Sequence, residues 1–258
     1  MKFKALLLSI LLLASPANAG VLFDGTNDCL SSASTIAFGT NIVTVSFWMY
    51  WDSFANDDDL AMELSANYNT NFPGLLIDPN ASAPVSGRFN AGISATGPTY
   101  RTESITRPSA AVWHHYSIVF DNSTAAGDIK FYVDGVSTST TVDANSKTTT
   151  GNIRTDTLYF MSRACTSLYA DGRLDEVYIH SGELSADEIS LLYNSRMRKI
   201  GQQIDNTLIS YWPLDECPDG TACATASMFR DNYDTDPDHL SPSNSPTGRA
   251  GEILSYAP

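Results

Sequence analysis

Two short hydrophobic runs joined by a polar loop constrain the fold more than any other stretch. The first run, 113–120, reads WHHYSIVF, and the second, 129–133, reads IKFYV. β-Branched and aromatic residues dominate both runs, and Gly127 lies in the loop between them, which predicts a β-hairpin with a long turn. Asp134-Gly135 predicts a second, tight turn, because both residues tolerate positive φ. The β-prone run 136–142 should therefore pair back and complete a three-stranded antiparallel meander.

This stretch and three others, in the expected order, resemble the laminin-G-like, concanavalin A-like jelly-roll domains. The others are similar to the family's opening strand, second strand, and closing strand with its short helix: LFDGTND at 22–28, VTVSFW at 43–48, and GRLDEVYI at 172–179 followed by ELSADEI at 183–189. The resemblance covers roughly residues 20–195. It implies an all-β, antiparallel jelly-roll β-sandwich with one short peripheral helix. It implies no single function, since such sandwiches include lectins, hydrolases, lyases and passive spacers.

The first 19 residues have the organisation of a secretory signal peptide. Lys2 and Lys4 are basic, 5–14 is an apolar run, and 17–19 is an Ala-Asn-Ala cleavage site, so the mature chain should begin at Gly20. The apolar run is too short to span a bilayer comfortably, and no later stretch is long and apolar enough to do so. We expect a secreted protein (extracellular, periplasmic or cell-surface) with no transmembrane anchor after cleavage.

The chain is acidic. Its formal net charge of −14 becomes −16 when Lys2 and Lys4 leave with the signal peptide. An acidic surface repels phosphates, so we expect no nucleic-acid partner. The acidity fits cation binding, although solubility alone also explains it. The mature chain of 239 residues (258 minus 19) suffices for one large sandwich and a tail.

Four cysteines follow the signal peptide: Cys29, Cys165, Cys217 and Cys223. An even number in an exported chain favours two disulfides over metal ligands or free thiols, and no C-x₂-C pair is present. The sequence alone allows three pairings. The resemblance favours Cys29–Cys165, because the opening and late strands of a jelly roll can lie side by side. Cys217–Cys223 would then close a local loop.

Trp48 and Tyr50 are the candidate ligand-binding residues. Alternation along their strand places the other set of side chains in the core: Val43, Val45, Phe47, Met49 and Trp51. Trp48 and Tyr50 then lie on the opposite face, where large aromatic side chains are unusual. They either stack on a sugar ring or are covered by a loop or by the C-terminal tail. The general burial of large aromatics favours the covered arrangement.

Calcium is the cofactor that this acidic chain favours, because Ca²⁺ takes several oxygen ligands. The resemblance also implies it, since laminin-G-like and pentraxin-like domains often carry calcium. Asp24 near the opening turn and Asp175 in the closing strand would converge if those strands are neighbours. Asp57 and Asp58 offer a second, loop-based cluster. Surface solvation, or an Asp that caps a turn, also explains each of these residues.

No catalytic motif is present. Sandwich glucanases of the resembled fold carry Glu-x-Asp-x-x-Glu on one strand, and this chain has no such string. Asp59 and Glu63 lie an even number of positions apart, but they are a single pair beside a loop. His114 and His115 are adjacent and lack a third partner, and nucleophile elbows, phosphate loops and H-E-x-x-H are absent. We therefore expect no enzymatic activity.

Residues 208–258 form a C-terminal extension, which follows a linker at 196–207. The run LISYWPLDE at 208–216 resembles the opening of a laminin-G-like repeat. It either begins a repeat that is cut short or returns as an extra strand that covers the first domain. The remainder is rich in Pro, Ser, Asn and Asp, so it should be irregular and either packed or partly disordered.

Together these features predict a secreted, non-catalytic jelly-roll domain at 20–195. By resemblance, its function is to recognise carbohydrate or a glycosylated surface, with calcium taking part. The alternative is a structural or adhesion protein of a cell surface or particle coat, and a divergent polysaccharide-degrading enzyme is the weakest of the three interpretations.

Overall fold

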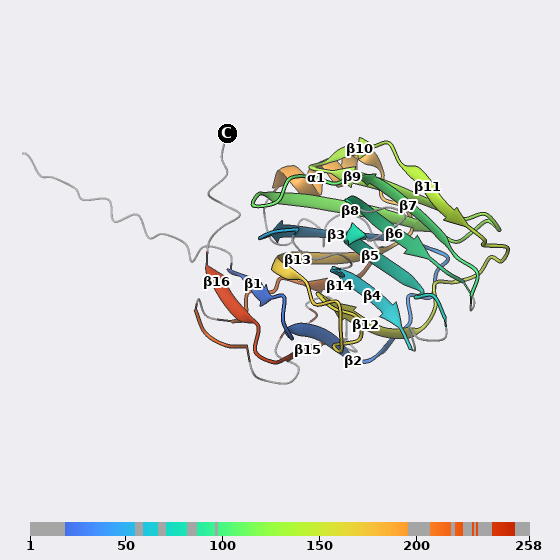
Figure 1. The fold of residues 1–258 in the computed structure, drawn as a ribbon. Coiled ribbons are helices and arrows are strands. Elements are labelled where there is room, and N and C mark those ends of the chain that lie inside the picture. Colours follow the sequence, from blue (N-terminus) through green and yellow to red (C-terminus); the bar gives the residue numbers. More distant parts are fainter. Residues whose placement is uncertain are drawn as a thin grey trace, which may run out of the picture.

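The structure, a computed structural model, describes residues 19–54, 59–66, 71–81, 87–95, 98–195, 207–217, 220–223, 229, 231 and 239–250. Two antiparallel sheets of eight strands each pack face to face in this part of the chain (Figure 1). One helix, α1 (Ala186–Ser195), lies outside the two sheets. The predicted β-sandwich with one short helix is confirmed.

The strands of the two sheets come from distant parts of the chain. In spatial order, sheet A contains β10 (Val136–Thr138), β9 (Asp128–Val133), β8 (Trp113–Asp121), β3 (Ile42–Trp51), β13 (Asp171–Ser181), β1 (Ala19–Asp24) and β16 (Thr247–Ala250), with β14 (Leu208–Trp212) paired to part of β13. Sheet B contains β11 (Thr141–Asn145), β7 (Arg101–Thr106), β6 (Arg88–Ile93), β5 (Leu75–Ala81), β4 (Met62–Ser65), β12 (Asp156–Phe160), β2 (Cys29–Ile36) and β15 (Leu240–Ser243).

One hydrophobic core fills the space between the sheets. The inward face of β3 is the predicted one, and its members are Val43, Val45, Phe47, Met49 and Trp51. From sheet B the same core takes side chains that include Leu64, Ile77, Phe89 and Phe160. Burying one such side chain contributes roughly 1.5–3 kcal/mol, so this core supplies most of the stability of the sandwich.

The predicted hairpin is present, with one correction at its end. β8 and β9 pair antiparallel, and β10 pairs back onto β9. Asp134 and Gly135 have φ of 51° and 76°, as the tight turn requires. The run 136–142 is not one strand, however, because the chain leaves sheet A after Thr138 and continues as β11 beside β7 in sheet B. Thr140, in the segment that crosses between the sheets, donates a hydrogen bond to the carboxylate of Glu103 on β7. This bond fixes the crossing segment to sheet B.

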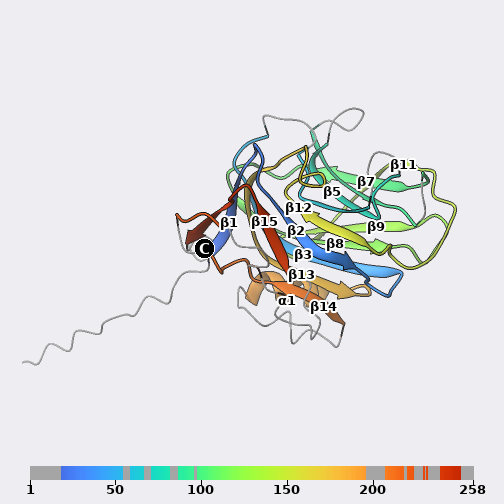
Figure 2. The same cartoon turned by 90° about the horizontal axis from the view of Figure 1, so that it is seen from below.

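Helix α1 begins at the predicted capping box. The backbone N–H of Ser185 donates to the Glu188 carboxylate at 2.7 Å, and the Glu188 N–H donates to the Ser185 hydroxyl at 3.3 Å. The helix lies on the side of sheet A that faces away from sheet B (Figure 2). Its buried side chains Ile189 and Leu192 pack there against Val119 of β8. The outer face of sheet A is therefore partly covered.

The C-terminal segment adds strands to both sheets. β14 pairs with β13, β15 with β2, and β16 with β1. β13 pairs first with β1 and then with β14, and its register shifts between Asp175 and Tyr178, where Glu176 has a φ of 49°. This irregularity in β13 allows it to pair with β1 along one part of its length and with β14 along the next part, on the same edge. Residues 196–206 lie outside the described part of the chain, so the domain boundaries stay a prediction.

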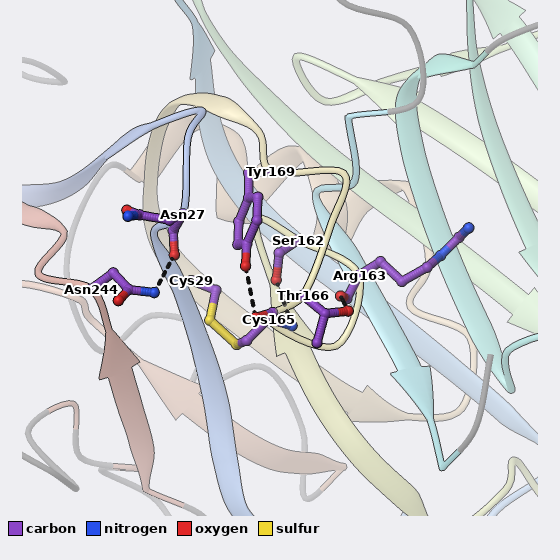
Figure 3. The surroundings of a disulfide bond; sticks show 8 residues. All are labelled: Asn27, Cys29, Ser162, Arg163, Cys165, Thr166, Tyr169 and Asn244. Carbon is purple, nitrogen blue, oxygen red and sulfur yellow. Dashed lines mark hydrogen bonds between the residues drawn. A yellow bond between two sulfur atoms is a disulfide. The ribbon is translucent and has the colours of Figure 1, made fainter. Parts of the chain in front are cut away.

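Two disulfides connect the predicted pairs, Cys29–Cys165 and Cys217–Cys223. Cys29 begins β2, and Cys165 lies in the loop between β12 and β13 (Figure 3). In this loop the Tyr169 hydroxyl donates to the carbonyl of Cys165 at 2.7 Å, and the Cys165 N–H donates to Ser162 at 3.1 Å. Four non-glycine residues of the loop have positive φ: Met161, Ala164, Cys165 and Leu168. The disulfide and these bonds hold a backbone conformation that such residues rarely adopt.

Candidate functional site

Trp48 and Tyr50 lie on the outer face of sheet A, as predicted. Trp48 is only 7% exposed, because its ring stacks on Tyr193 of α1 at 5.7 Å and packs against His115 at 5.3 Å. Tyr50 is half-buried, with the Arg173 guanidinium 4.6 Å from its ring centre. The helix thus covers Trp48, rather than a loop or the C-terminal tail. The two residues do not form an open aromatic platform.

His115 makes this aromatic layer sensitive to acid. Burial lowers the pKa of His115 to about 4 from its ordinary value of 6.5, and Asp134 opposes the shift only partly. Below pH 6.5 the unfolded chain therefore binds a proton that the folded chain does not, and stability falls until the pH reaches about 4. A pKa lowered this far corresponds to a loss of roughly 3 kcal/mol.

We expect His115→Phe to remove this loss. The measurement is urea unfolding of the wild-type protein and of the variant between pH 7 and 4.5. Asp28 is present in both proteins and has the opposite effect on stability, because burial and the neighbouring Asp24 raise its pKa to about 6 and its protonation stabilises the folded state. The difference between the two proteins therefore reports His115. The wild-type free energy of unfolding should fall relative to the variant by up to about 1.4 kcal/mol per pH unit. Parallel curves for the two proteins would contradict the assignment.

Asp24 and Asp175 do not converge as predicted. β1 and β13 are neighbours, but Asp24 lies opposite Asp171, and the register separates it from Asp175 by four positions, about 13 Å. Asp175 is buried on sheet A and accepts a hydrogen bond from the Glu176 N–H at 3.0 Å. Asp57 and Asp58 lie outside the described residues. Within the described ranges, no three His, Cys, Asp or Glu side chains converge as metal ligands.

A different acidic group forms where β1 turns into β2. Asp28 is buried, and one of its carboxylate oxygens accepts a hydrogen bond from the Asp24 N–H at 3.3 Å. Its other oxygen has no hydrogen-bond partner among the described residues. Burial, followed by the charges of Asp52 and Asp24, raises the pKa of Asp171 across the strand pair. The charge of Asp24 therefore acts on both the Asp28 and the Asp171 carboxyl groups, and a cation would relieve this repulsion.

The outer face of sheet B carries a row of polar side chains, which we call the polar row: Asp78, Asn90, Ser104 and Asp143. On β6, outward Asn90 alternates with the core residues Phe89 and Ala91. Asn90 lies opposite Asp78 on β5 and Ser104 on β7, and its amide donates to Asp143 of β11 at 2.9 Å. The row thus crosses four adjacent strands. Its first three members are buried and fixed, and Asp143 is half-buried.

An aromatic pair lies on the same face. Phe72 and Tyr100 stack with ring centres 4.2 Å apart and planes within 9° of parallel. Phe72 lies over Gly92 of β6, where a Cβ atom would be only 2.5 Å from the ring. Glycine is needed there because any side chain would displace the ring. Both aromatic residues are half-buried, so each keeps part of its surface exposed.

A buried carboxylate extends this face toward the disulfide. Glu63 of β4 is fully buried, accepts a hydrogen bond from Ser65, and pairs with Arg163 at 3.1 Å. Burial raises the pKa of Glu63, although Ser65 and Arg163 oppose the shift. Arg163 extends from the loop that holds Cys165 toward sheet B (Figure 3). The disulfide loop therefore positions the cation that neutralises Glu63.

Sequence reasoning missed the polar row and the aromatic pair. The stretch 52–112 predicts short strands near 60–64, 74–77 and 88–93, where β4, β5 and β6 lie, but the frequent turns between them leave their pairing undetermined. One signal was present, because polar Arg88 and Asn90 alternate with apolar Phe89 and Ala91. That pattern predicts a strand with a polar outer face. It does not reveal which strands lie beside it.

Comparisons with known proteins agree with this architecture. A family model described as the concanavalin A-like lectin/glucanases superfamily matches residues 24–190. A search of curated proteins finds no match. The solved structures include a putative carbohydrate binding protein from Bacteroides ovatus, which is 16% identical with a TM-score of 0.58 over 92% of this chain and 61% of that chain.

A SAP-like pentraxin from Limulus polyphemus is also similar. It is 13% identical, with a TM-score of 0.53 over 70% of this chain and 84% of that chain. At these identities the likeness to both structures shows the fold alone. The chain spans less than two thirds of the Bacteroides protein. In the part of the chain that the structure describes, no helix is long and apolar enough to cross a membrane.

Proposed function

The chain belongs to the concanavalin A-like lectin/glucanases superfamily, and from this premise we propose that it is a secreted, non-catalytic module that binds carbohydrate. The observation that carries the proposal is the aromatic pair beside the polar row on the outer face of sheet B. Sugar rings present an apolar C–H face and a rim of hydroxyl groups. Aromatic rings suit the first, and fixed amide, carboxylate and guanidinium groups suit the second.

Burial supports the division of roles within this face. Asp78, Asn90 and Ser104 are buried, so they hold the arrangement in place. Phe72 and Tyr100 are half-buried, so they are open to contact a ligand. Binding sites gain affinity when contact residues are fixed before the ligand arrives. A sugar would therefore meet a preformed surface.

Non-catalytic binding is favoured over hydrolysis by the state of Glu63. Its two oxygens are engaged by Ser65 and Arg163, and the side chain is fully buried. A glycosidase needs two carboxylates on either side of the scissile bond.

The exposed large hydrophobic residues in the described ranges are Val136, Val142 and Leu191. They are few, which favours a carbohydrate ligand over the alternative of a structural or adhesion protein.

Secretion and calcium are parts of the same proposal. The apolar run at 5–14 and the cleavage site at 17–19 support secretion, and two disulfides fit an oxidising compartment. For calcium, the support is Asp28, which has one carboxylate oxygen without a hydrogen-bond partner among the described residues and whose pKa is raised by burial and by Asp24. Backbone carbonyls and water would complete such a site.

A glycan array tests the proposal. We expect the mature protein, 20–258, to bind selectively, and Phe72→Ala and Tyr100→Ala each to weaken binding about tenfold or more through lost stacking. Tyr50→Ala, which removes an aromatic ring from sheet A, is the matched control and should bind normally. Loss with Tyr50→Ala alone would transfer the site to sheet A. Absence of any glycan signal would refute the proposed function.

The same array in calcium and in EDTA tests the metal. Binding and thermal stability should fall in EDTA, and Asp28→Asn should abolish the difference between the two buffers. A protein whose binding and melting temperature are the same in both buffers has no functional calcium site at Asp28.

A further inference from the structure

Arg88 is held in place on the outer face of sheet B without a carboxylate partner. Its Nε donates to the Ser104 hydroxyl at 2.6 Å, and its Nη2 donates to the Ser104 carbonyl and to the Thr141 hydroxyl, both at 3.1 Å. All three acceptors are neutral. Among the residues that the structure describes, Arg88 forms no ion pair.

This arrangement is unusual for the chain, which has 29 acidic and 15 basic residues. Several other cations in the described ranges have carboxylate partners: Arg101 with Glu103, Arg154 with Asp156, Arg163 with Glu63, Arg173 with Asp52, and Lys130 with Glu183. Lys147 is held by backbone carbonyls of neighbouring loops. An ordered guanidinium that is only half-buried keeps donors available, because neutral acceptors occupy only part of its fork.

We propose that Arg88 receives one anionic substituent, a carboxylate or a sulfate ester, of a glycan bound on this face. The inference rests on the proposed function and names the ligand class of the same site. Guanidinium groups bind such oxyanions through parallel, charge-assisted hydrogen bonds. Ser104 belongs to the polar row, so the same residue fixes both Arg88 and the centre of the face.

The spacing on β6 sets the size of the ligand. Arg88 and Gly92 lie on the same side of the strand, four residues apart, which is about 13 Å. Phe72, one member of the aromatic pair, lies over Gly92. A ligand that touches both the pair and Arg88 must therefore be longer than one sugar ring, and its charge must lie away from the stacked ring. An acidic oligosaccharide meets both conditions.

The charge of the whole chain limits how acidic that ligand can be. With a formal net charge of −14, the protein repels a densely charged polyanion as it approaches. One anionic group in contact with a fixed guanidinium avoids most of this repulsion, because the attraction acts over a few ångströms. We therefore expect sparsely charged oligosaccharides to bind better than polyanions such as heparin.

The test is a glycan array printed with matched pairs: uronic acid oligosaccharides beside their methyl esters, and sulfated oligosaccharides beside their desulfated forms. We expect the wild-type protein to prefer acidic members by about tenfold or more. Preference within the uronate pairs identifies a carboxylate, and preference within the sulfate pairs identifies a sulfate ester. Arg88→Gln should abolish the preference, so that acidic and neutral members of each pair bind equally, and Arg88→Lys should keep part of it.

Lys130→Gln is the charge-matched control, since it removes one positive charge from the other sheet. It should keep the wild-type preference, and melting curves check that each variant is folded. Equal binding of acidic and neutral members, or a preference that survives in Arg88→Gln, would overturn the inference. If acidic and neutral members bind equally and Phe72→Ala abolishes that binding, the proposed function stands while the role of Arg88 fails. A protein that binds no glycan refutes both.

Discussion

The double variant Cys29→Ala/Cys165→Ala should lose about 2–5 kcal/mol of unfolding free energy. The bond joins residues separated by 136 positions, and a cross-link that closes so long a loop strongly restricts the unfolded chain. It also holds the loop whose residues have positive φ and which positions Arg163 against Glu63. The loss should therefore include destabilisation of the folded state.

The matched control is Cys217→Ala/Cys223→Ala, because that bond closes a loop of only six positions. The chain-entropy argument gives it about 2.4 kcal/mol, roughly half the value of the longer loop. Urea unfolding at pH 7 measures both. Equal losses would show that loop length does not determine the contribution. A loss below about 1 kcal/mol in the first variant would show that the strand pairing alone secures β2.

Glu103→Ala should destabilise the folded protein strongly, with an expected loss of about 3–5 kcal/mol. Glu103 is 2% exposed on β7 of sheet B, and its carboxylate accepts hydrogen bonds from Arg101 at 2.7 Å and from the Ile129 N–H of β9 at 3.1 Å. It also accepts a hydrogen bond from Thr140 in the crossing between the sheets. Its removal would leave the buried Ile129 N–H without its acceptor and Arg101 with only the more distant Asp128, at 3.8 Å.

Glu103→Gln separates charge from shape. The amide oxygen can still accept one of these hydrogen bonds, so the loss should be smaller than for alanine. Glu183→Gln is the control, because its pair with Lys130 is exposed and should contribute no more than about 1 kcal/mol. Unfolding in urea ranks the three variants. A Glu103→Ala protein as stable as Glu183→Gln would show that Glu103 does not connect the sheets.

The fold was predictable because its signals are local. Alternation in 43–51 indicates the buried face of β3, Asp134-Gly135 indicates a turn, and Ser185 with Glu188 indicates the start of a helix. Each signal depends on residues close together in sequence. The extent of 136–142 was not predictable in this way. Whether β10 continues in sheet A or the chain crosses to sheet B depends on Glu103, a distant residue.

The candidate site was less predictable because register decides it. The predicted convergence of Asp24 and Asp175 required β1 and β13 to be neighbours. They are neighbours, but the register places Asp171 opposite Asp24 and Asp175 four positions away. The polar row depends on the alignment of four strands, which no one of their sequences determines. The outward face of Trp48 was anticipated correctly. Its cover, Tyr193, comes from a helix that sequence alone could not dock.

The pairing of β1 and β2 determines when this protein can fold. β1 pairs with β13 and β16, and β2 pairs with β12 and β15. Among the described strands, no partner of either begins before residue 156. During synthesis the backbone N–H and C=O groups of β1 and β2 therefore stay unpaired until the later part of the chain has been made. Shortening the chain before residue 240 would remove β15 and β16, so preparations of this protein should keep that end to avoid edge-to-edge aggregation.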